Sequence, residues 1–128
     1  MDKVCFKTKL GPAAVGPYST AMLAGETIYL SGMIGIDPAT QKPVEGGTLA
    51  QAKQAFENIR TVLGELGAAM GDVLKTTVYL TDIGEFGAVN SLYAEYFGPD
   101  YPARTCVEVS KLPMGLSIEV ECIARVHK

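Results

Sequence analysis

The chain has 128 residues, of which 48% are hydrophobic, and its formal net charge at pH 7 is −3. This length predicts a single domain, residues 1–128, that can bury a hydrophobic core without disulfides or metals. The acidic balance argues against nucleic-acid binding, which gains affinity by neutralising phosphates with Lys and Arg, and no stretch reaches the roughly 20 apolar residues that span a bilayer.

The first predicted elements are three strands. Residues 4–9 alternate apolar and polar side chains, which is typical of a half-buried strand. Residues 11–17 contain two prolines and break regular structure. Residues 18–24 and 27–31 then predict a hairpin, with Gly25 and Glu26 as its loop. A turn is expected at Asp37-Pro38.

A helix follows, and it begins at a predicted capping box in which Thr48 and Gln51 satisfy each other's backbone N–H groups. Gly67 is the expected carboxyl-terminal stop. The apolar residues of the helix recur at three- and four-residue spacing and predict one buried stripe: Leu49, Ala52, Phe56, Ile59, Leu63 and Leu66.

The second half of the chain predicts one more helix and three more strands. Residues 73–81 are rich in β-branched side chains and apolar enough to lie in the middle of a sheet. Residues 86–97 return to helical spacing, and two alternating strands follow within residues 101–124. The order β-β-β-α-β-α-β-β predicts an α+β fold, a mixed sheet with both helices on one face. The other face would lack cover, so we expect a closed oligomer.

The last two strands carry the reactive side chains. Alternation places Arg104 and Cys106 on one face of the first strand, and Glu119 and Glu121 together on one face of the second. If these two strands pair, a guanidinium, a thiol and carboxylates meet on one patch. We expect this patch to be the functional site.

Arg104 is a candidate carboxylate anchor, because a guanidinium offers two parallel N–H donors. On spacing alone, a structural ion pair is the simpler interpretation. Either Glu119 or Glu121 could orient and deprotonate a water molecule, with a pKa raised by burial. Both could instead form the wet face of an amphipathic strand, and periodicity does not distinguish the two glutamates.

The three cysteines, Cys5, Cys106 and Cys122, are widely spaced and form no C-x-x-C pair. This pattern indicates a reducing compartment, and we expect a cytoplasmic protein without a bound metal. A nucleophilic Cys106 would need an adjacent base, and the only histidine, His127, is the penultimate residue and expected to be frayed. Arg104 is the one neighbour that could lower the pKa of Cys106.

Six segments together resemble the RidA/YjgF enamine/imine deaminase family, and the match runs in order from about residue 11 to residue 126. The last two segments in combination are specific, whereas each of the others alone is weak. The segments are GPYS (16–19), YLSGMIG (29–35), LKTTVYLTD (74–82), VN (89–90), PARTCVEV (102–109) and IEVECIA (118–124).

The resemblance implies a chorismate-mutase-like α+β subunit assembled as a homotrimer with clefts between subunits. It also implies cofactor-free hydrolysis of 2-imino and 2-enamino acids, such as 2-aminoacrylate and 2-iminobutanoate, to 2-keto acids and ammonia. PLP-dependent dehydratases would generate these substrates.

The family's functional residues map onto this chain through the shared motifs. The carboxylate-binding arginine matches Arg104, and the water-positioning glutamate matches Glu119 rather than Glu121. The resemblance assigns further pocket positions to four residues: Tyr18, Gly32, Asn90 and Cys106. It implies that Cys106 acts through its backbone and shape. One departure is Gln41, where the family's turn commonly carries glycine, and this puts only the shape of that loop in question.

Two other functions compete with deamination. A non-catalytic sensor would bind small 2-keto or amino acids in the same cleft. A ribonuclease or translation inhibitor, a label that some relatives carry, draws little support from the acidic charge.

Overall fold

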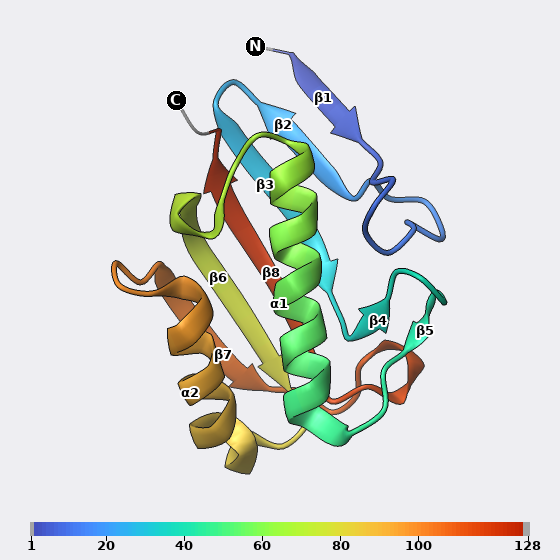
Figure 1. Cartoon of the computed structure of the whole chain (residues 1–128), viewed down its shortest axis with the longest axis vertical. Coiled ribbons are helices and arrows are strands. Elements are labelled where there is room, and N and C mark those ends of the chain that lie inside the picture. Colours follow the sequence, from blue (N-terminus) through green and yellow to red (C-terminus); the bar gives the residue numbers. More distant parts are fainter. Residues whose placement is uncertain (1, 127–128) are drawn as a thin grey trace.

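A six-stranded sheet forms the frame of the molecule, in the strand order β1-β2-β3-β8-β6-β7 (Figure 1). The structure is a computed structural model and describes residues 2–126. The strands of this sheet are β1 (Lys3–Phe6), β2 (Ala21–Ala24), β3 (Thr27–Met33), β6 (Val73–Leu80), β7 (Ala103–Glu108) and β8 (Ile118–Arg125). β6 and β7 run parallel, and the other neighbouring pairs are antiparallel.

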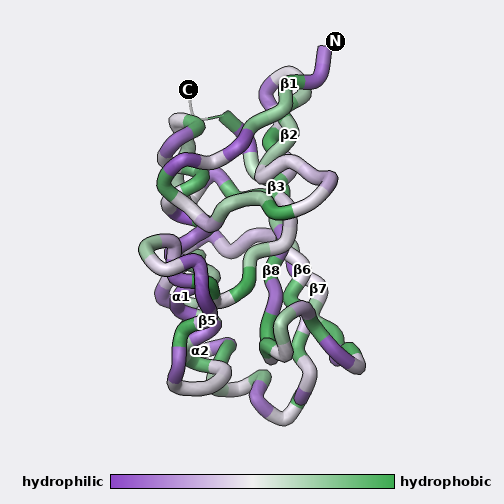
Figure 2. The backbone as a smooth tube through the Cα atoms, turned by 90° about the vertical axis from the view of Figure 1, so that its right-hand side faces the viewer, coloured by the Kyte–Doolittle hydropathy of each residue, from purple (hydrophilic) through white to green (hydrophobic). Residues whose placement is uncertain are grey.

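Two helices, α1 (Gly47–Glu65) and α2 (Phe86–Phe97), lie on one face of the sheet, as predicted (Figure 2). Phe56 of α1 joins the two helices, with its ring centroid 5.9 Å from that of Tyr93 and 5.5 Å from that of Phe97. We call the opposite face of the sheet the open face, because no helix within residues 2–126 covers it. No helix in this range is long and apolar enough to cross a membrane.

α1 buries the middle of the stripe that its spacing predicts but not its ends. Leu49 is 48% exposed and Leu66 is partly buried, whereas Phe56, Ile59 and Leu63 are fully buried. The helix ends at Glu65, and the predicted stop residue Gly67, whose φ is 74°, follows two residues later. The N–H of Ala68 donates to the carbonyl of Leu63 and that of Gly67 to the carbonyl of Gly64, which is a Schellman motif.

The predicted capping box at the start of α1 is wrong. The helix begins at Gly47, and its amino terminus receives no side-chain cap from the described residues. Thr48 Oγ1 instead contacts Glu85 and lies 2.7 Å from Ser117 Oγ. Gln51 Oε1 accepts a hydrogen bond from the N–H of Ser117 at 2.8 Å. Both side chains therefore tie α1 to the segment before β8, because distant partners replace the local cap.

β3 contains a bulge that alternation does not predict. The predicted hairpin with β2 is confirmed, and its loop residue Gly25 has φ 60°. Further along, the register of β3 with β8 shifts between Leu30 and Met33. Ser31 and Gly32 therefore lie together opposite Glu121, which is the two-against-one arrangement of a β-bulge.

The last two strands do not pair, so the condition for a shared patch is not met. β6 lies between β7 and β8 and pairs with both. β6, α2 and β7 form a strand–helix–strand unit with neighbouring parallel strands, the usual result of a short helical crossover. Cys106 and Glu119 are therefore carried by strands that do not touch.

A small ribbon of β4 (Ile36–Asp37) and β5 (Lys42–Pro43) follows β3. The turn predicted at Asp37 connects these strands, and Asp37 Oδ1 accepts the N–H of Ala39 at 2.9 Å. Gln41 adopts φ 59°, a left-handed conformation that favours glycine. Three short 3₁₀ turns complete the described elements: η1 (Met70–Asp72), η2 (Ile83–Glu85) and η3 (Pro113–Gly115).

Candidate functional site

A cavity of about 640 Å³ opens beside the end of β3, between the loop after β1 and the η3 turn. We call it the β3 cavity. Most of its wall is apolar and includes Pro12, Ala14, Val15, Met33, Ile34 and Met114. The described residues that line it include one carboxylate, Glu119, and no lysine or arginine.

Glu119 reaches the β3 cavity from β8 and lies directly over Gly32 of β3. A Cβ atom at position 32 would lie 2.2 Å from Glu119 Oε2, so glycine alone leaves room for this carboxylate. Tyr18 lines the same cavity from the loop before β2. The structure therefore brings three of the predicted site residues, Tyr18, Gly32 and Glu119, together.

The environment of Glu119 disfavours its charge. Desolvation raises the pKa of its carboxyl, and the neighbouring charge of Glu121 raises this pKa further. Glu121 accepts a hydrogen bond from the hydroxyl of Tyr79, whereas nothing within residues 2–126 donates one to Glu119. A carboxyl with a raised pKa, and with its oxygens not bonded to protein donors, suits proton exchange with a bound water molecule.

Asn58 of α1 fixes the floor of the β3 cavity. This residue is 1% exposed, and its Nδ2 donates to the carbonyl of Ile36 at 2.8 Å and to that of Ile34 at 3.2 Å. Gly35 packs against α1 so closely that a Cβ there would lie 2.7 Å from the Cα of Gln51. The segment leaving β3 is therefore held by both hydrogen bonds and close packing.

A second cavity, of about 410 Å³, lies between β7 and α2 and is lined by Arg104 and Asn90. Arg104 Nη1 donates to Asn90 Oδ1 at 2.7 Å. The guanidinium carbon of Arg104 lies 4.6 Å from the ring centroid of Tyr93 and 5.2 Å from that of Phe86. The aromatic rings and the amide thus orient the guanidinium plane. We call this the Arg104 cavity.

Arg104 makes no salt bridge with any carboxylate in the described part of the chain. A structural ion pair, the simpler interpretation of its spacing, is therefore not formed among residues 2–126. A guanidinium has five N–H donors, and one N–H bonds to Asn90. The remaining donors can bind a planar anion such as a carboxylate.

The two cavities lie on opposite faces of the sheet. Arg104 is in register with Thr76, whose hydroxyl meets that of Tyr93 on α2, so Arg104 is on the helix-covered face. Glu119 is in register with Tyr79 and alternates with the buried Ile118, so it is on the open face. The expectation that both groups meet on one patch of a single chain is wrong, because β6 separates their strands and alternation turns them apart.

Cys106 lines neither of these two cavities. It is half-buried against the hydrophobic core, and burial raises the pKa of its thiol more than the charge of Arg104 lowers it. Cys106 is thus not an activated thiolate in this chain. His127, the alternative base, lies outside the described residues. Among residues 2–126, no group of three or more His, Cys, Asp and Glu side chains could hold a metal ion.

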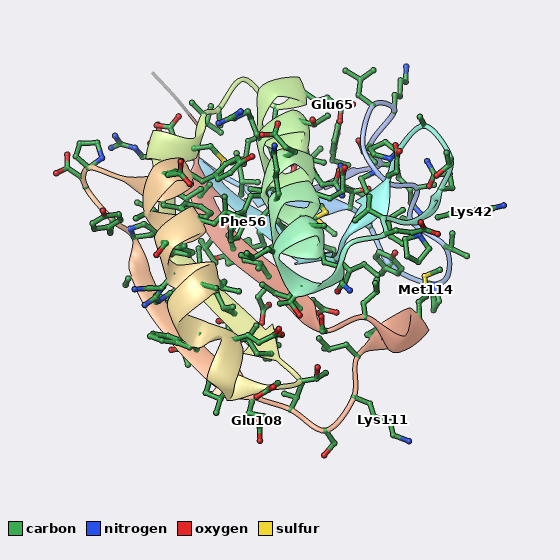
Figure 3. The ribbon with its side chains drawn as sticks, turned by 60° about the horizontal axis from the view of Figure 1, so that its bottom comes forward. Lys42, Phe56, Glu65, Glu108, Lys111 and Met114 are labelled. Atoms are coloured by element: carbon green, nitrogen blue, oxygen red, sulfur yellow. The ribbon has the colours of Figure 1, made fainter. Side chains whose placement is uncertain are left out.

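Among the lining residues that sequence reasoning did not assign to the site are Gln41 and Met114. Met114 is 63% exposed with φ 60°, and it stands on η3 at the molecular surface (Figure 3). The Pro113-Met114-Gly115 sequence gave a turn signal but no indication of where the turn would lie. Gln41 was expected to affect only its own loop, yet it contributes to the cavity wall.

Comparisons with known proteins agree with this fold. The family model described as Endoribonuclease L-PSP matches residues 8–126. A RutC family protein of Pyrococcus abyssi is 46% identical over 97% of this chain and 98% of its own. The human 2-iminobutanoate/2-iminopropanoate deaminase is 45% identical over 91% of this chain and 85% of its own.

A solved structure is similarly close. The crystal structure of RidA from an Antarctic Psychrobacter bacterium superposes with a TM-score of 0.91 at 41% identity, covering 96% of this chain and 99% of that one. A family match over nearly the whole chain, relatives above 40% identity and a common fold lead to one conclusion. The chain belongs to the RidA/YjgF family, the family of the Endoribonuclease L-PSP model.

Proposed function

We propose that this protein is an enamine/imine deaminase that hydrolyses 2-imino acids to 2-keto acids and ammonia. The observation that carries the proposal is a pair of oppositely charged groups, a desolvated carboxylate at Glu119 and an oriented guanidinium at Arg104, neither of which forms a salt bridge within residues 2–126. Relatives named 2-iminobutanoate/2-iminopropanoate deaminase, at 45–47% identity, support the same activity.

In this mechanism, Arg104 binds the substrate carboxylate through parallel N–H donors. Glu119 accepts a proton from a water molecule as the water oxygen adds to the carbon of the C=N bond, and it passes this proton to the nitrogen, which gives a carbinolamine. Glu119 then carries the hydroxyl proton of the carbinolamine to the amino nitrogen, the C–N bond breaks with its electron pair on that nitrogen, and the products are ammonia and the keto group. One water is consumed, and no redox cofactor is needed.

The mechanism requires a second copy of the chain, because Arg104 and Glu119 lie on opposite faces of the sheet in one copy. We propose a homotrimer in which the open face of one subunit meets its neighbour, so that the β3 cavity of one subunit faces the Arg104 cavity of the next. The open face carries Tyr29 and Val107, which are exposed in the single chain and suit burial at such a contact.

The substrates that we propose are 2-iminopropanoate, with its enamine tautomer 2-aminoacrylate, and 2-iminobutanoate. Asn90 would orient Arg104, to which it is bonded, and Tyr18 and Gly32 would shape the wall around Glu119. Cys106 would contribute packing beneath Arg104 rather than a nucleophile.

The test is ammonia release from 2-aminoacrylate that a PLP-dependent dehydratase generates in the assay. We expect the wild-type protein to accelerate the release and Arg104→Ala to lower kcat/KM by about 10- to 100-fold, the value of losing hydrogen bonds to a charged group. Arg60→Ala is the matched control, because Arg60 pairs with Glu57 on the outer surface of α1. Equal activity of Arg104→Ala and Arg60→Ala would remove Arg104 from the site.

Two other functions are outcomes of the same test. A binding protein would be stabilised thermally by 2-keto acids without accelerating ammonia release. A ribonuclease, the activity in the description of the matched family model, would cleave RNA in a manner that depends on Glu119 or Arg104. The apolar wall of the β3 cavity and its single carboxylate among described lining residues favour a small organic acid over a polyanion.

A further inference from the structure

Gln41 connects two segments that both form the β3 cavity. Its Nε2 donates to the carbonyl of Pro38 in its own turn at 2.7 Å, and its Oε1 accepts the backbone N–H of Ala13 at 3.0 Å. Because the Ala13 N–H donates and the Pro38 carbonyl accepts, only one orientation of the side-chain amide satisfies both partners. Gln41 and Ala13 both line the cavity (the β4–β5 ribbon and the loop after β1 are neighbours in Figure 1).

The loop after β1 is anchored firmly at its start. Glu65, at the end of α1, accepts hydrogen bonds from the hydroxyl of Thr8 and from the N–H groups of Lys9 and Leu10. Gly11 then packs against α1 so tightly that a Cβ atom there would lie 2.9 Å from a methyl group of Val62. The carboxylate of Glu65 has a lowered pKa, partly because of these donors, so the anchor persists at neutral pH.

Beyond Gly11 the loop is held by fewer hydrogen bonds. Residues 12–15 are half-buried or exposed, and all four line the β3 cavity. Within the described residues, the bond from Ala13 to Gln41 is the one side-chain hydrogen bond that these four residues make. The position of this apolar wall therefore depends on a residue 28 positions away in the sequence.

The backbone of Gln41 has a conformation that is unfavourable for glutamine. Its φ of 59° lies in the left-handed region, which glycine adopts without steric cost and glutamine does not. A glycine here would suit the turn better but would give up both side-chain hydrogen bonds. The side chain thus has a role that the turn alone does not require.

We propose that Gln41 is a positioning residue: it fixes residues 12–15 as the outer wall of the β3 cavity and thereby determines selectivity for the substrate side chain. This inference rests on the proposed function, in which the imine carbon lies at Glu119. Among 2-imino acids, those with an apolar side chain larger than methyl would gain affinity, because they would bury that side chain against Pro12 and Val15. An acidic side chain would meet Glu119 and no cation among the described lining residues.

The experiment compares two imino acids, those formed from alanine and from leucine by an amino-acid oxidase. We expect Gln41→Gly to raise KM for the leucine-derived imine about fivefold, the loss of about one neutral hydrogen bond, with little change for the alanine-derived imine. kcat should change little for either substrate, because Glu119 is not displaced. Gln41→Glu keeps an acceptor for the N–H of Ala13 but loses the donor to the carbonyl of Pro38, so it should recover part of the wild-type selectivity.

Lys42→Ala is the matched control. Lys42 is the next residue in the same ribbon, its side chain points away from the molecule, and it does not line the cavity (Figure 3). This variant should keep the wild-type ratio of the two KM values. An unchanged ratio in Gln41→Gly, or a Gln41→Glu protein as unselective as Gln41→Gly, would overturn the inference.

A binding measurement separates this inference from the proposed function. Calorimetric titration with pyruvate and with 4-methyl-2-oxopentanoate measures the same selectivity without turnover. If the wild-type protein releases no ammonia but prefers the larger keto acid, and Gln41→Gly loses that preference, deamination fails while the role of Gln41 stands. If the wild-type and Gln41→Gly proteins prefer the larger keto acid equally, Gln41 does not determine selectivity, even if deamination is observed.

Discussion

Glu119, the catalytic carboxylate of the proposed mechanism, lies where the fold disfavours its charge. Its carboxylate is partly removed from water, faces the charge of Glu121 and receives no hydrogen bond from residues 2–126. Each of these conditions disfavours the ionised form in the folded protein relative to the unfolded chain. A residue selected for stability alone would be neutral at this position.

We therefore expect Glu119→Gln to raise the melting temperature by a few degrees at pH 8 while it abolishes deamination. The sign follows from the raised pKa of Glu119: the folded wild-type protein binds this proton more tightly than the unfolded chain, so its stability increases as the pH falls through that pKa. The advantage of the variant should thus fade at acidic pH, where the wild-type carboxyl is protonated. Calorimetric melting at several pH values measures both effects.

A variant that melts lower than the wild type at pH 8 would contradict this account, because it would mean that the charge of Glu119 is stabilised in the fold. Glu57→Gln serves as the comparison. Glu57 is partly exposed and pairs with Arg60, so loss of its charge should not raise the melting temperature.

At the scale of elements, α1 shows how burial and spacing can disagree at the end of a helix. Leu49 fits the apolar stripe by spacing, but it lies in the first turn of α1 and is 48% exposed. Phe56 lies in the middle of the helix and contacts three aromatic rings of α2. Phe56 should therefore contribute more to the free energy of unfolding than Leu49 does.

Phe56→Ala should lower the free energy of unfolding by about 3–5 kcal/mol, because the truncation leaves a cavity between α1 and α2 that the sheet cannot close. Leu49→Ala, a truncation on the same predicted stripe, should change it by about 0.5 kcal/mol or less. Chemical denaturation of the two variants gives both values. Similar losses in the two variants would show that the exposure of Leu49 is not the deciding factor.

The elements themselves could be predicted because each is long enough to show its period. The helix over residues 86–97 has the predicted bounds, and the strand over residues 73–81 differs by one residue. β4 and β5 have two residues each, too few for any period, and they were missed. Thr48 and Gln51 fit a capping box locally, but Ser117 offered partners that no local pattern contains.

The candidate site could be predicted only as a set of residues, not as an arrangement. Alternation correctly separated the two faces of each strand, but it says nothing about which strands are neighbours. The insertion of β6 between β7 and β8 placed Arg104 and Glu119 apart. The resemblance to a family identified which residues to examine, and the part of Gln41 in the cavity wall emerged only from its hydrogen bonds.

At the scale of the whole molecule, the proposed site needs Arg104 from one copy and Glu119 from another. The Glu119→Gln protein should be inactive alone, and the Arg104→Ala protein should keep at most about a tenth of the wild-type activity. After denaturation and refolding together in equal amounts, random assembly of a closed ring should restore about a quarter of the wild-type activity, since that fraction of contacts joins two intact halves. Ammonia release after gel filtration measures the recovery.

Each variant refolded alone is the control. A mixture that stays inactive, although mass spectrometry shows mixed oligomers, would mean that both residues act within one chain or that one of them does not act at all.

The placement of the two cavities on opposite faces of one sheet also restricts the symmetry of any assembly. A two-fold contact presents the same patch of both copies to each other, and faces that point in opposite directions cannot both belong to such a patch. A contact that joins the β3 cavity of one copy to the Arg104 cavity of the next, as we propose, is therefore head-to-tail. A head-to-tail contact either closes into a ring, in which every cavity has a mate, or continues as a filament. The proposed homotrimer thus requires a contact surface whose curvature closes the ring.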